Sequence, residues 1–292
     1  MLRRHDSVNR NTEDGSGQTT ADVSPERIPD NRRERKDIGM RLENKVAVVT
    51  GASSGMGKAI VETFVREGAS VVAVARRKER LEALAESLQD APGRIAIFVG
   101  DVTDGHTDVE MIDFAVETYG ALDILVNNAG IMDDMSGVGD ATDEKYEQVM
   151  KVNLYGPMAA MRKAVNYFKS NGRPGNIINI SSVGSMHTAA GAIYCASKAA
   201  FNALTTNTAF MYMEDGIRCN AIAPGSIATE ISSSMGMPNM AGYARTQKVM
   251  AAMPSRIGTA QEIANTALFL ASDEASYVNG VVLPVDGGWN AM

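Results

Sequence analysis

The chain has 292 residues, 45% of them hydrophobic and 22% charged, so it can bury the core of one large domain. Its net charge of −7 argues against a nucleic-acid surface, and its two cysteines and three histidines match neither a metal-binding spacing nor a disulfide framework. With no apolar run as long as a membrane span and no signal-peptide core, we expect a soluble cytoplasmic protein that binds no nucleic acid, membrane or metal.

The first segment, residues 1–39, is rich in Arg, Asp, Asn and Ser and has no apolar periodicity. Such a composition cannot offset the entropy of ordering, so we expect a disordered extension here and a single folded domain over residues 40–292. Met40 directly precedes the first apolar strand and could be the true initiator. A genuine flexible tail is the alternative, and the sequence leaves both open.

From residue 46 onward, short β-branched runs alternate with amphipathic helical stretches such as 56–66, where Met56, Ile60 and Phe64 are spaced for one buried face. This alternation predicts an α/β fold, a single doubly wound parallel (Rossmann-type) sheet of about seven strands with helices on both faces. The predicted strands are 46–50, 70–75, 95–100, 122–127, 176–181, 217–223 and 281–285.

A glycine-rich turn lies where the first strand meets the first helix. Its glycines allow a tight turn, and the helix N-terminus behind it can hold a pyrophosphate, so we expect a dinucleotide there. The glycine spacing departs from GxGxxG. The predicted contact residues of this turn are Gly51, Ser53, Ser54, Gly55, Met56 and Gly57.

The end of the second predicted strand bears on the choice of cofactor. An NAD site would place Asp or Glu there, but Ala75 is followed by Arg76 and Arg77. Guanidinium groups suit a 2′-phosphate, so we expect NADP(H) to be preferred over NAD(H). The alternative is that these arginines, with the basic residues that follow, form only the solvated start of a helix.

Tyr194 and Lys198 stand one helical turn apart, which places a phenol and an ammonium on one helix face. A nearby positive charge favours the ionised phenol, so this spacing predicts a lowered pKa for Tyr194 and proton exchange near neutral pH. Taken alone, a Tyr/Lys pair at this spacing is usually an ordinary surface pair on a helix.

Several motifs occur in one chain: TGxxxGxG over residues 50–57, then Asn127-Asn128-Ala129-Gly130, Asn153, Ser182, the Tyr194/Lys198 pair and Pro224-Gly225. In this order the chain resembles the classical short-chain dehydrogenases/reductases, from about residue 41 to its C-terminus. The resemblance implies hydride transfer between a nicotinamide ring and a carbonyl carbon. It also implies that the protein is a homotetramer or a dimer.

The resemblance further assigns four catalytic roles. Tyr194 would exchange the hydroxyl proton, and Lys198 would lower its pKa and hold the nicotinamide ribose. Ser182 would orient the substrate oxygen, with the adjacent Ser181 as its competitor for that role. Asn153 would join a water-mediated proton path toward Lys198.

Further cofactor contacts also follow from the resemblance. One pair after the third strand would contact the adenine, the NNAG segment would line the cleft, and the segment after the sixth strand would clasp the nicotinamide. Tyr194 and Lys198 belong to this cofactor set as well. The remaining members are Asp101, Val102, Asn128, Ala129, Gly130, Pro224, Gly225, Ile227 and Thr229.

The same resemblance implies that the segment 231–240 forms the substrate lid, and this segment contains three methionines. Met132, Met135 and Met186 lie on other loops expected near the substrate. Methionines make an adaptable apolar surface, which favours a bulky apolar ketone or alcohol as the partner small molecule. Methionine as simple core filler is the alternative, in a chain with 18 of them.

Three functions are compatible with these residues. The first is a hydroxysteroid or bile-acid dehydrogenase, as in bacterial members of the family. The second is a 3-oxoacyl-[acyl-carrier-protein] reductase, for which Arg162 and Lys163 could form a basic docking patch or simply a solvated helix face. The third is a non-catalytic nucleotide-sensing regulator, which has no need of the full catalytic set.

Overall fold

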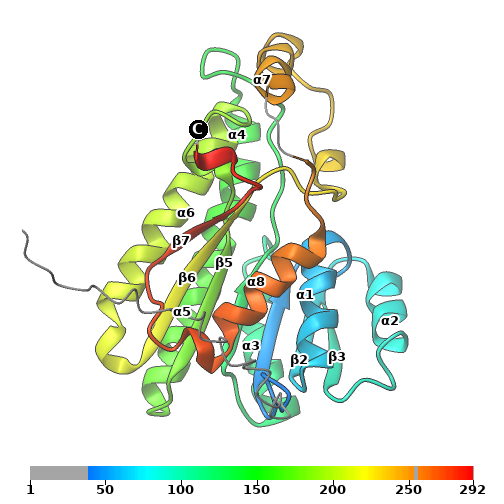
Figure 1. Cartoon of the computed structure of the whole chain (residues 1–292), viewed down its shortest axis with the longest axis vertical. Coiled ribbons are helices and arrows are strands. Elements are labelled where there is room, and N and C mark those ends of the chain that lie inside the picture. Colours follow the sequence, from blue (N-terminus) through cyan, green and yellow to red (C-terminus); the bar gives the residue numbers. More distant parts are fainter. Residues whose placement is uncertain (1–38, 253–255, 292) are drawn as a thin grey trace, which may run out of the picture. The chain divides into compact units, whose positions relative to one another are not determined.

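The computed structural model describes residues 39–252 and 256–291, so the predicted extension lies almost wholly outside the described residues. Seven parallel strands form one sheet in the order β3-β2-β1-β4-β5-β6-β7 (Figure 1). This confirms the predicted single doubly wound sheet. The strands are β1 (Val46–Thr50), β2 (Ser70–Ala75), β3 (Arg94–Val99), β4 (Ile124–Asn127), β5 (Gly175–Ile180), β6 (Ile217–Pro224) and β7 (Val282–Val285).

Helices cover both faces of the sheet, as the crossover connections of a parallel sheet require. One buried cluster joins the sheet to α1, α2 and α8, and a second joins it to α3, α5 and α6. The helices are α1 (Gly55–Arg66), α2 (Lys78–Glu86), α3 (Thr107–Tyr119), α4 (Asp143–Met150), α5 (Gly156–Ser170), α6 (Ala192–Met211), α7 (Met240–Ala252) and α8 (Ala260–Ala271).

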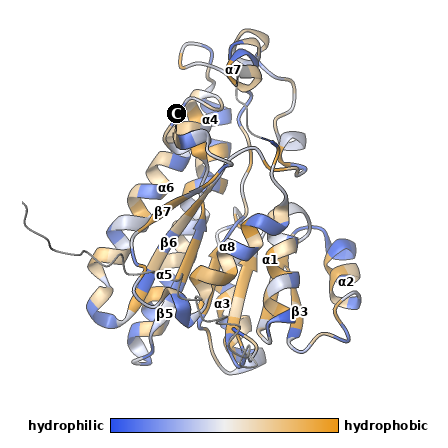
Figure 2. Cartoon of the chain, viewed as in Figure 1, coloured by the Kyte–Doolittle hydropathy of each residue, from blue (hydrophilic) through white to orange (hydrophobic). Residues whose placement is uncertain are grey.

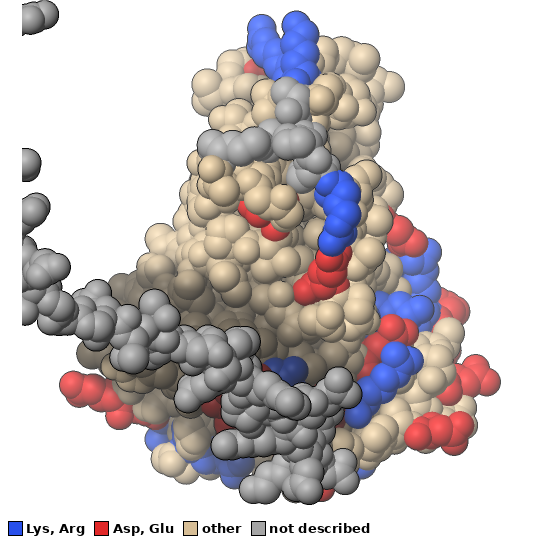
Figure 3. Space-filling view, in the orientation of Figure 1, with Lys and Arg blue, Asp and Glu red and all other residues tan. Residues whose placement is uncertain are grey.

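The residues of each element explain its place. Strands β1 and β2 are runs of apolar and β-branched side chains buried on both faces, and most of the sheet is drawn in orange in Figure 2. The edge strands β3 and β7 are only partly buried. In α1, Ile60 and Phe64 are fully buried and Met56 packs partly against the same cluster, as their spacing predicts. In the view of Figure 3, acidic and basic side chains are interspersed along the edge that carries α2.

Two features lie at the carboxyl edge of the sheet. Strands β1 and β4 are neighbours there, and the chain leaves them toward opposite sides, which creates the crevice in which doubly wound proteins bind ligands. After β6 the chain forms a short 3₁₀ segment, Ile231–Ser234, and then α7, which lies beyond this edge in Figure 1.

A π-helical turn, Lys151–Tyr155, joins α4 to α5. None of the described helices is both long and apolar enough to cross a bilayer.

Candidate active site

The turn between β1 and α1 is shaped by its glycines. Gly51 and Gly55 have φ values of +68° and +54°, in the left-handed region that side chains disfavour. At Gly57 a Cβ atom would lie 2.3 Å from the carbonyl oxygen of Gly51, so only glycine lets the helix approach the turn. Helix α1 starts without a side-chain cap from Ser54 and without an acidic residue in its first turn. These N–H groups can therefore receive an anionic phosphate.

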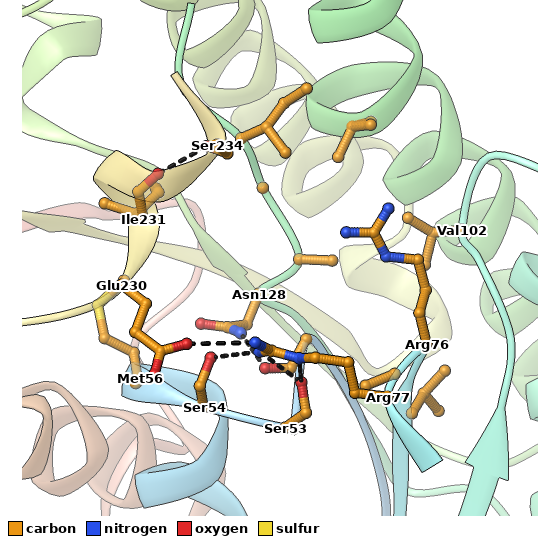
Figure 4. A pocket seen from close by; sticks show the side chains of 18 of the residues that line it. Ser53, Ser54, Met56, Arg76, Arg77, Val102, Asn128, Glu230, Ile231 and Ser234 are labelled. Atoms are coloured by element: carbon orange, nitrogen blue, oxygen red, sulfur yellow. Dashed lines mark hydrogen bonds and ion pairs between the residues drawn. The ribbon is translucent and has the colours of Figure 1, made fainter. Parts of the chain in front are cut away.

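A groove runs from this turn across the carboxyl ends of β2 and β4 (Figure 4). Asn128 forms part of its wall, and its amide donates to the carbonyl oxygen of Thr50 at 2.9 Å. The Oδ1 atom of Asn128 is buried and has no hydrogen-bond partner among the described residues. An unpaired buried acceptor fits a site whose ligand brings a hydrogen-bond donor.

Arginines from the end of β2 lie at the edge of the groove. Arg76 reaches into it and lies 3.5 Å from the carboxylate of Asp101. The Arg77 guanidinium donates to the hydroxyl of Ser54 at 2.8 Å and to Glu230 at 3.2 Å. Figure 4 shows this chain of contacts crossing the groove from α1 to the segment that follows β6. This end of the groove is therefore basic, but the carboxylates of Asp101 and Glu230 already pair with its two arginines.

Glu230 receives a second arginine as well. Arg80 donates to the same carboxylate oxygen at 2.7 Å. Hydrogen bonds from Arg80 and Arg77 hold the pKa of the Glu230 carboxyl below its usual range. Glu230 therefore carries its charge throughout the neutral pH range and links the segment after β6 to the basic side of the groove.

Most of the predicted cofactor residues line this groove: Gly51, Ser53, Ser54, Gly55, Met56, Arg76, Arg77, Asp101, Val102, Asn128, Ala129, Gly130 and Thr229. Four do not. Gly57 packs on Gly51, and a Cβ atom at Gly225 would lie 2.8 Å from Asp286. Pro224 is buried as the last residue of β6, and Ile227 bridges to Gly258. These four residues shape the backbone around the groove.

The groove floor leads to Tyr194 and Lys198 on α6. A Cβ atom at Gly130 would lie 3.5 Å from both the Lys198 Nζ atom and the Asn153 Oδ1 atom, so the absence of a side chain keeps this approach open. Lys198 Nζ lies 5.9 Å from the ring centroid of Tyr194 and donates to the carbonyl oxygen of Ile180 at 2.8 Å. The structure thus brings the phenol and the ammonium to the end of the groove.

Burial dominates the ionisation of this pair. It raises the pKa of Tyr194 to about 12, although a hydrogen bond with Ser182 opposes the rise. Burial also lowers the pKa of Lys198 to about 8. The predicted lowering of the Tyr194 pKa is therefore wrong for this structure, because removal of the phenol from water outweighs the nearby ammonium. At neutral pH Tyr194 holds its proton.

The two adjacent serines differ in their surroundings. Ser182 interacts with the phenol of Tyr194 and accepts a hydrogen bond from the Gly184 N–H at 3.0 Å. Ser181 is buried and its hydroxyl donates to the carbonyl oxygen of Lys198 at 3.4 Å. Of the two hydroxyls, that of Ser182 is the one beside the phenol.

Asn153 lies in the π-helical turn and is fully buried. Its side chain makes two hydrogen bonds of 2.9 Å with the backbone of Ile131, one to each polar group. It also donates to the hydroxyl of Ser197 at 3.2 Å. Asn153 thereby ties the loop after β4 to α6.

An apolar cluster surrounds the phenol of Tyr194. Met135 and Met235 are buried against it, and Met132 and Cys195 pack on its edge. The other methionines expected here lie elsewhere: Met186, Met237 and Met240 are exposed, the last two by 90% and 70%. Only one of the three lid methionines therefore reaches Tyr194.

Known proteins are similar to this chain over most of its length. Residues 51–290 match the family model described as enoyl-(acyl carrier protein) reductase. The 3β-hydroxysteroid dehydrogenase 2 of Eggerthella lenta is 44% identical over 252 residues, 86% of this chain and 96% of that protein. The chain belongs to the classical short-chain dehydrogenase/reductase family. A 3-oxoacyl-[acyl-carrier-protein] reductase of Thermotoga maritima is 39% identical over 250 residues, 85% of this chain and 99% of the relative.

Solved structures of family members agree with this fold. Levodione reductase superimposes with a TM-score of 0.79 at 34% identity, covering 86% of this chain and all of that one. A putative NAD(P)-dependent gluconate 5-dehydrogenase from Beutenbergia cavernae, solved with bound NADP at low occupancy, gives 0.76 at 33% identity, covering 87% and 100%. This dehydrogenase/reductase is therefore an oxidoreductase that acts on hydroxyl or ketone groups with a nicotinamide dinucleotide.

Two charged residues of the site have no role in the expectations drawn from sequence. Glu230 directly follows Thr229, and Asp133 follows the NNAG segment by three residues. Glu230 binds Arg77 and Arg80, at the start of α2, and Asp133 binds the start of α6. The partners of both residues therefore come from distant parts of the chain. The only sequence signal for Asp133 is an acidic pair in an otherwise apolar loop.

Proposed function

We propose that this dehydrogenase/reductase interconverts a secondary alcohol and a ketone on a bulky apolar substrate of hydroxysteroid or bile-acid type, with NADP(H). The observation that carries this proposal is the apolar cluster at the phenol of Tyr194, to which Met135 and Met235 contribute buried side chains. Such thioether side chains adapt to large apolar ligands. The 44% identity with a 3β-hydroxysteroid dehydrogenase supports the same substrate class.

The cofactor would lie in the groove of Figure 4, with its phosphates at the Gly51–Gly57 turn and its adenosine end beside Arg76 and Asp101. The unpaired Oδ1 atom of Asn128 and the side-chain-free Gly130 fit such an occupant. When bound, the nicotinamide supplies or accepts the hydride.

The protein's own part is to bind, orient and move a proton. The Tyr194 hydroxyl would donate its proton to the substrate oxygen during reduction and take it back during oxidation. Ser182 would hold that oxygen by a hydrogen bond, and Lys198 would place positive charge at the groove floor. Asn153 would keep the loop after β4 in place, and through it the proton path toward Lys198.

The direction of the Tyr194 shift has a chemical consequence. A phenol with a pKa of about 12 is protonated at neutral pH, which suits an acid in ketone reduction. Alcohol oxidation needs the phenolate, so its rate should rise with pH. Buried Lys198, with a pKa of about 8, gradually loses its charge over the same range.

The preference for NADP(H) rests on Arg76 and Arg77. Both line the groove at the end of β2, where they could make charge-assisted hydrogen bonds to a 2′-phosphate. The residue that follows β2 is Arg76, where an NAD site would have Asp or Glu. Arg77 would have to exchange Glu230, at 3.2 Å, for the phosphate.

A second candidate is reduction of 3-oxoacyl thioesters on a carrier protein, favoured by the 39% identity with the Thermotoga maritima reductase. Its expected basic docking patch is weakened in the structure. Lys163 pairs with Asp113 at 2.6 Å, which leaves Arg162 as the exposed basic group. The hydroxysteroid class is therefore the stronger of the two.

One panel assay distinguishes these functions. Purified protein is assayed with NADPH, NADP, NADH and NAD against steroid ketones and alcohols, bile acids, acetoacetyl thioesters and simple polyols. Turnover of steroids or bile acids with NADP(H) is the expected result. Turnover of thioesters alone would replace the first proposal by the second.

We also propose that the protein assembles as a homotetramer or dimer. Phe210, Met213 and Tyr277 line a second hollow at the far end of α6 and expose 68%, 52% and 102% of their surfaces. Clustered exposed apolar side chains are typical of interaction surfaces. Sedimentation of the protein at several concentrations measures the assembly, and a monomer at all of them would reject it.

A further inference from the structure

Asp133 is a buried carboxylate that binds the backbone of Tyr194. The residue is fully buried, and every hydrogen bond that the structure gives its side chain comes from a backbone N–H. One oxygen accepts from Met135 at 3.0 Å and from Gly191 at 3.1 Å. The other accepts from Tyr194 at 2.9 Å. None of the ion pairs among the described residues involves Asp133, so the backbone holds this carboxylate.

Two of those N–H groups belong to the start of α6. The helix begins at Ala192, and its N-cap residue, Gly191, offers no side-chain cap. Asp133, from the loop after β4, supplies the missing acceptor and binds the N–H of Tyr194 directly. The helix terminus that carries the phenol is thus capped from a different part of the chain.

The surroundings are built to admit the carboxylate. A Cβ atom at Gly191 would lie 2.3 Å from the Oδ2 atom of Asp133, although φ of −73° and ψ of 171° would suit any residue. Met135 adopts a φ of +67°, a conformation that non-glycine residues rarely take and that is retained where the surroundings enforce it. The absence of a side chain at Gly191 and the strained backbone of Met135 both allow Asp133 to reach the start of α6.

The loop that carries Asp133 is itself fixed to the catalytic helices. Asn153 binds both backbone polar groups of Ile131, two residues before Asp133. Gly130 forms the groove floor beside Lys198. A single loop therefore connects the floor of the cofactor groove to the backbone of Tyr194.

We propose that Asp133 is a positioning residue for the reaction: it sets the phenol of Tyr194 relative to the cofactor groove and favours the protonated phenol. This inference rests on the proposed role of Tyr194. Misplacement of a reacting group by about 1 Å can slow a reaction by about a hundredfold. The negative charge of Asp133 disfavours the phenolate and also contributes to the raised pKa of Tyr194.

The charged and titratable groups that face the phenol are few among the described residues. Lys198 and Cys195 come from its own helix, and Asp133 comes from the loop after β4. Ser182 adds a hydroxyl, and the lid adds the thioether of Met235. Loss of the Asp133 charge should therefore make the phenolate easier to form.

The test is Asp133→Asn, assayed with NADP(H) and the 3-hydroxysteroid/3-oxosteroid pair, or with acetoacetyl thioester if the panel selects that substrate. The NH₂ group of the asparagine would face a backbone N–H, so two donors meet and the hydrogen bond at that position is lost. We therefore expect kcat for ketone reduction to fall by about tenfold to a hundredfold. NADP affinity should stay within about twofold. The alkaline limb of the pH profile should move to lower pH.

Two further variants separate position from charge. Asp134→Asn removes the neighbouring carboxylate, which binds Ser136, and should leave kcat and the pH profile unchanged. Gly191→Ala pushes on Asp133 and keeps its charge, so kcat should fall while the alkaline limb stays in place. Thermal melting of each variant shows how much protein is folded.

Each outcome of these experiments either supports or rejects the positioning role of Asp133. If folded Asp133→Asn keeps both the wild-type kcat and the wild-type pH profile, or loses only melting temperature, Asp133 is a structural cap and the inference is wrong. If Tyr194→Phe is as active as wild type, the proposed role of Tyr194 fails instead. An inactive Tyr194→Phe with an unaffected Asp133→Asn rejects the inference alone.

Discussion

The dinucleotide groove and the surroundings of Tyr194 hold their charges in opposite ways. At the edge of the groove the side chains of Arg77 and Arg80 are 45% and 46% exposed, and both pair with Glu230, whose side chain is 53% exposed. At the far end Lys198 is 3% exposed, and no ion pair among the described residues includes it. Exposed pairs contribute little and exchange partners readily, whereas a buried lone charge is costly. The groove is thus built for exchange of partners and the phenol site for a fixed arrangement.

The largest effect is expected at the buried end, from Tyr194→Phe. Removal of the hydroxyl removes the proposed proton donor but almost none of the packing, so kcat should fall by about a hundredfold or more with NADP binding largely intact. Steady-state kinetics and a cofactor titration measure the two quantities. An active variant would leave the buried pair without a chemical role.

Lys198→Met should separate activity from stability at the same end. The lowering of the Lys198 pKa from 10.5 to about 8 corresponds to about 3 kcal/mol of free energy that the buried charge costs the folded state. The cost is complete below about pH 8, because the folded protein then buries the ammonium. It fades as the pH rises toward 10.5, where the unfolded chain loses its proton too.

The variant should therefore lose activity by about a hundredfold while its free energy of unfolding at pH 7 rises by up to about 3 kcal/mol. Denaturant unfolding at pH 7 and at pH 10 measures the gain, which should be smaller at the higher pH. Lys78→Met, at an exposed position of α2, is the control and should change neither quantity appreciably. A destabilised Lys198→Met would show that the ammonium stabilises the fold.

At the exposed end, Arg76→Asp should alter cofactor choice without altering chemistry. A carboxylate repels the 2′-phosphate and can bind the ribose hydroxyl of NAD. The ratio of kcat/KM for NADP to that for NAD should fall by about tenfold or more. Both constants are measured with one substrate, and an unchanged ratio would reject the NADP assignment.

The smallest effect is expected from Glu230→Gln. Without its carboxylate partner, Arg77 is released toward the 2′-phosphate, and NADP should bind about two- to fivefold more tightly, as expected for an exposed pair. The gain should shrink at high salt. Glu274→Gln removes a carboxylate that pairs with Arg41 and serves as the control. Weaker NADP binding by Glu230→Gln would show that Glu230 organises the groove.

The fold and the open end of the site could be predicted from sequence to a large extent. Periodicity placed all seven strands, with shifts of one or two residues such as Arg94–Val99 for the predicted 95–100. Local motifs also placed most groove residues, because the glycine turn and the NNAG segment follow strands whose carboxyl ends meet.

The buried end could not be predicted in the same way. The direction of the Tyr194 pKa shift depends on burial, which is produced by Met135 and Met235 from loops about a hundred residues apart. The spacing of Tyr194 and Lys198 shows only that they share a helix face. The contacts of Asp133 could not be predicted for a similar reason, since its partners at the start of α6 lie about sixty residues away in the chain.

The most direct test of the account is the pH dependence of kcat/KM for alcohol oxidation, measured with NADP for the wild type and Tyr194→Phe. The wild-type rate should rise with pH as the phenol of Tyr194 ionises, and the residual rate of the variant should lack this rise. Parallel pH profiles for the two proteins, at comparable rates, would contradict it.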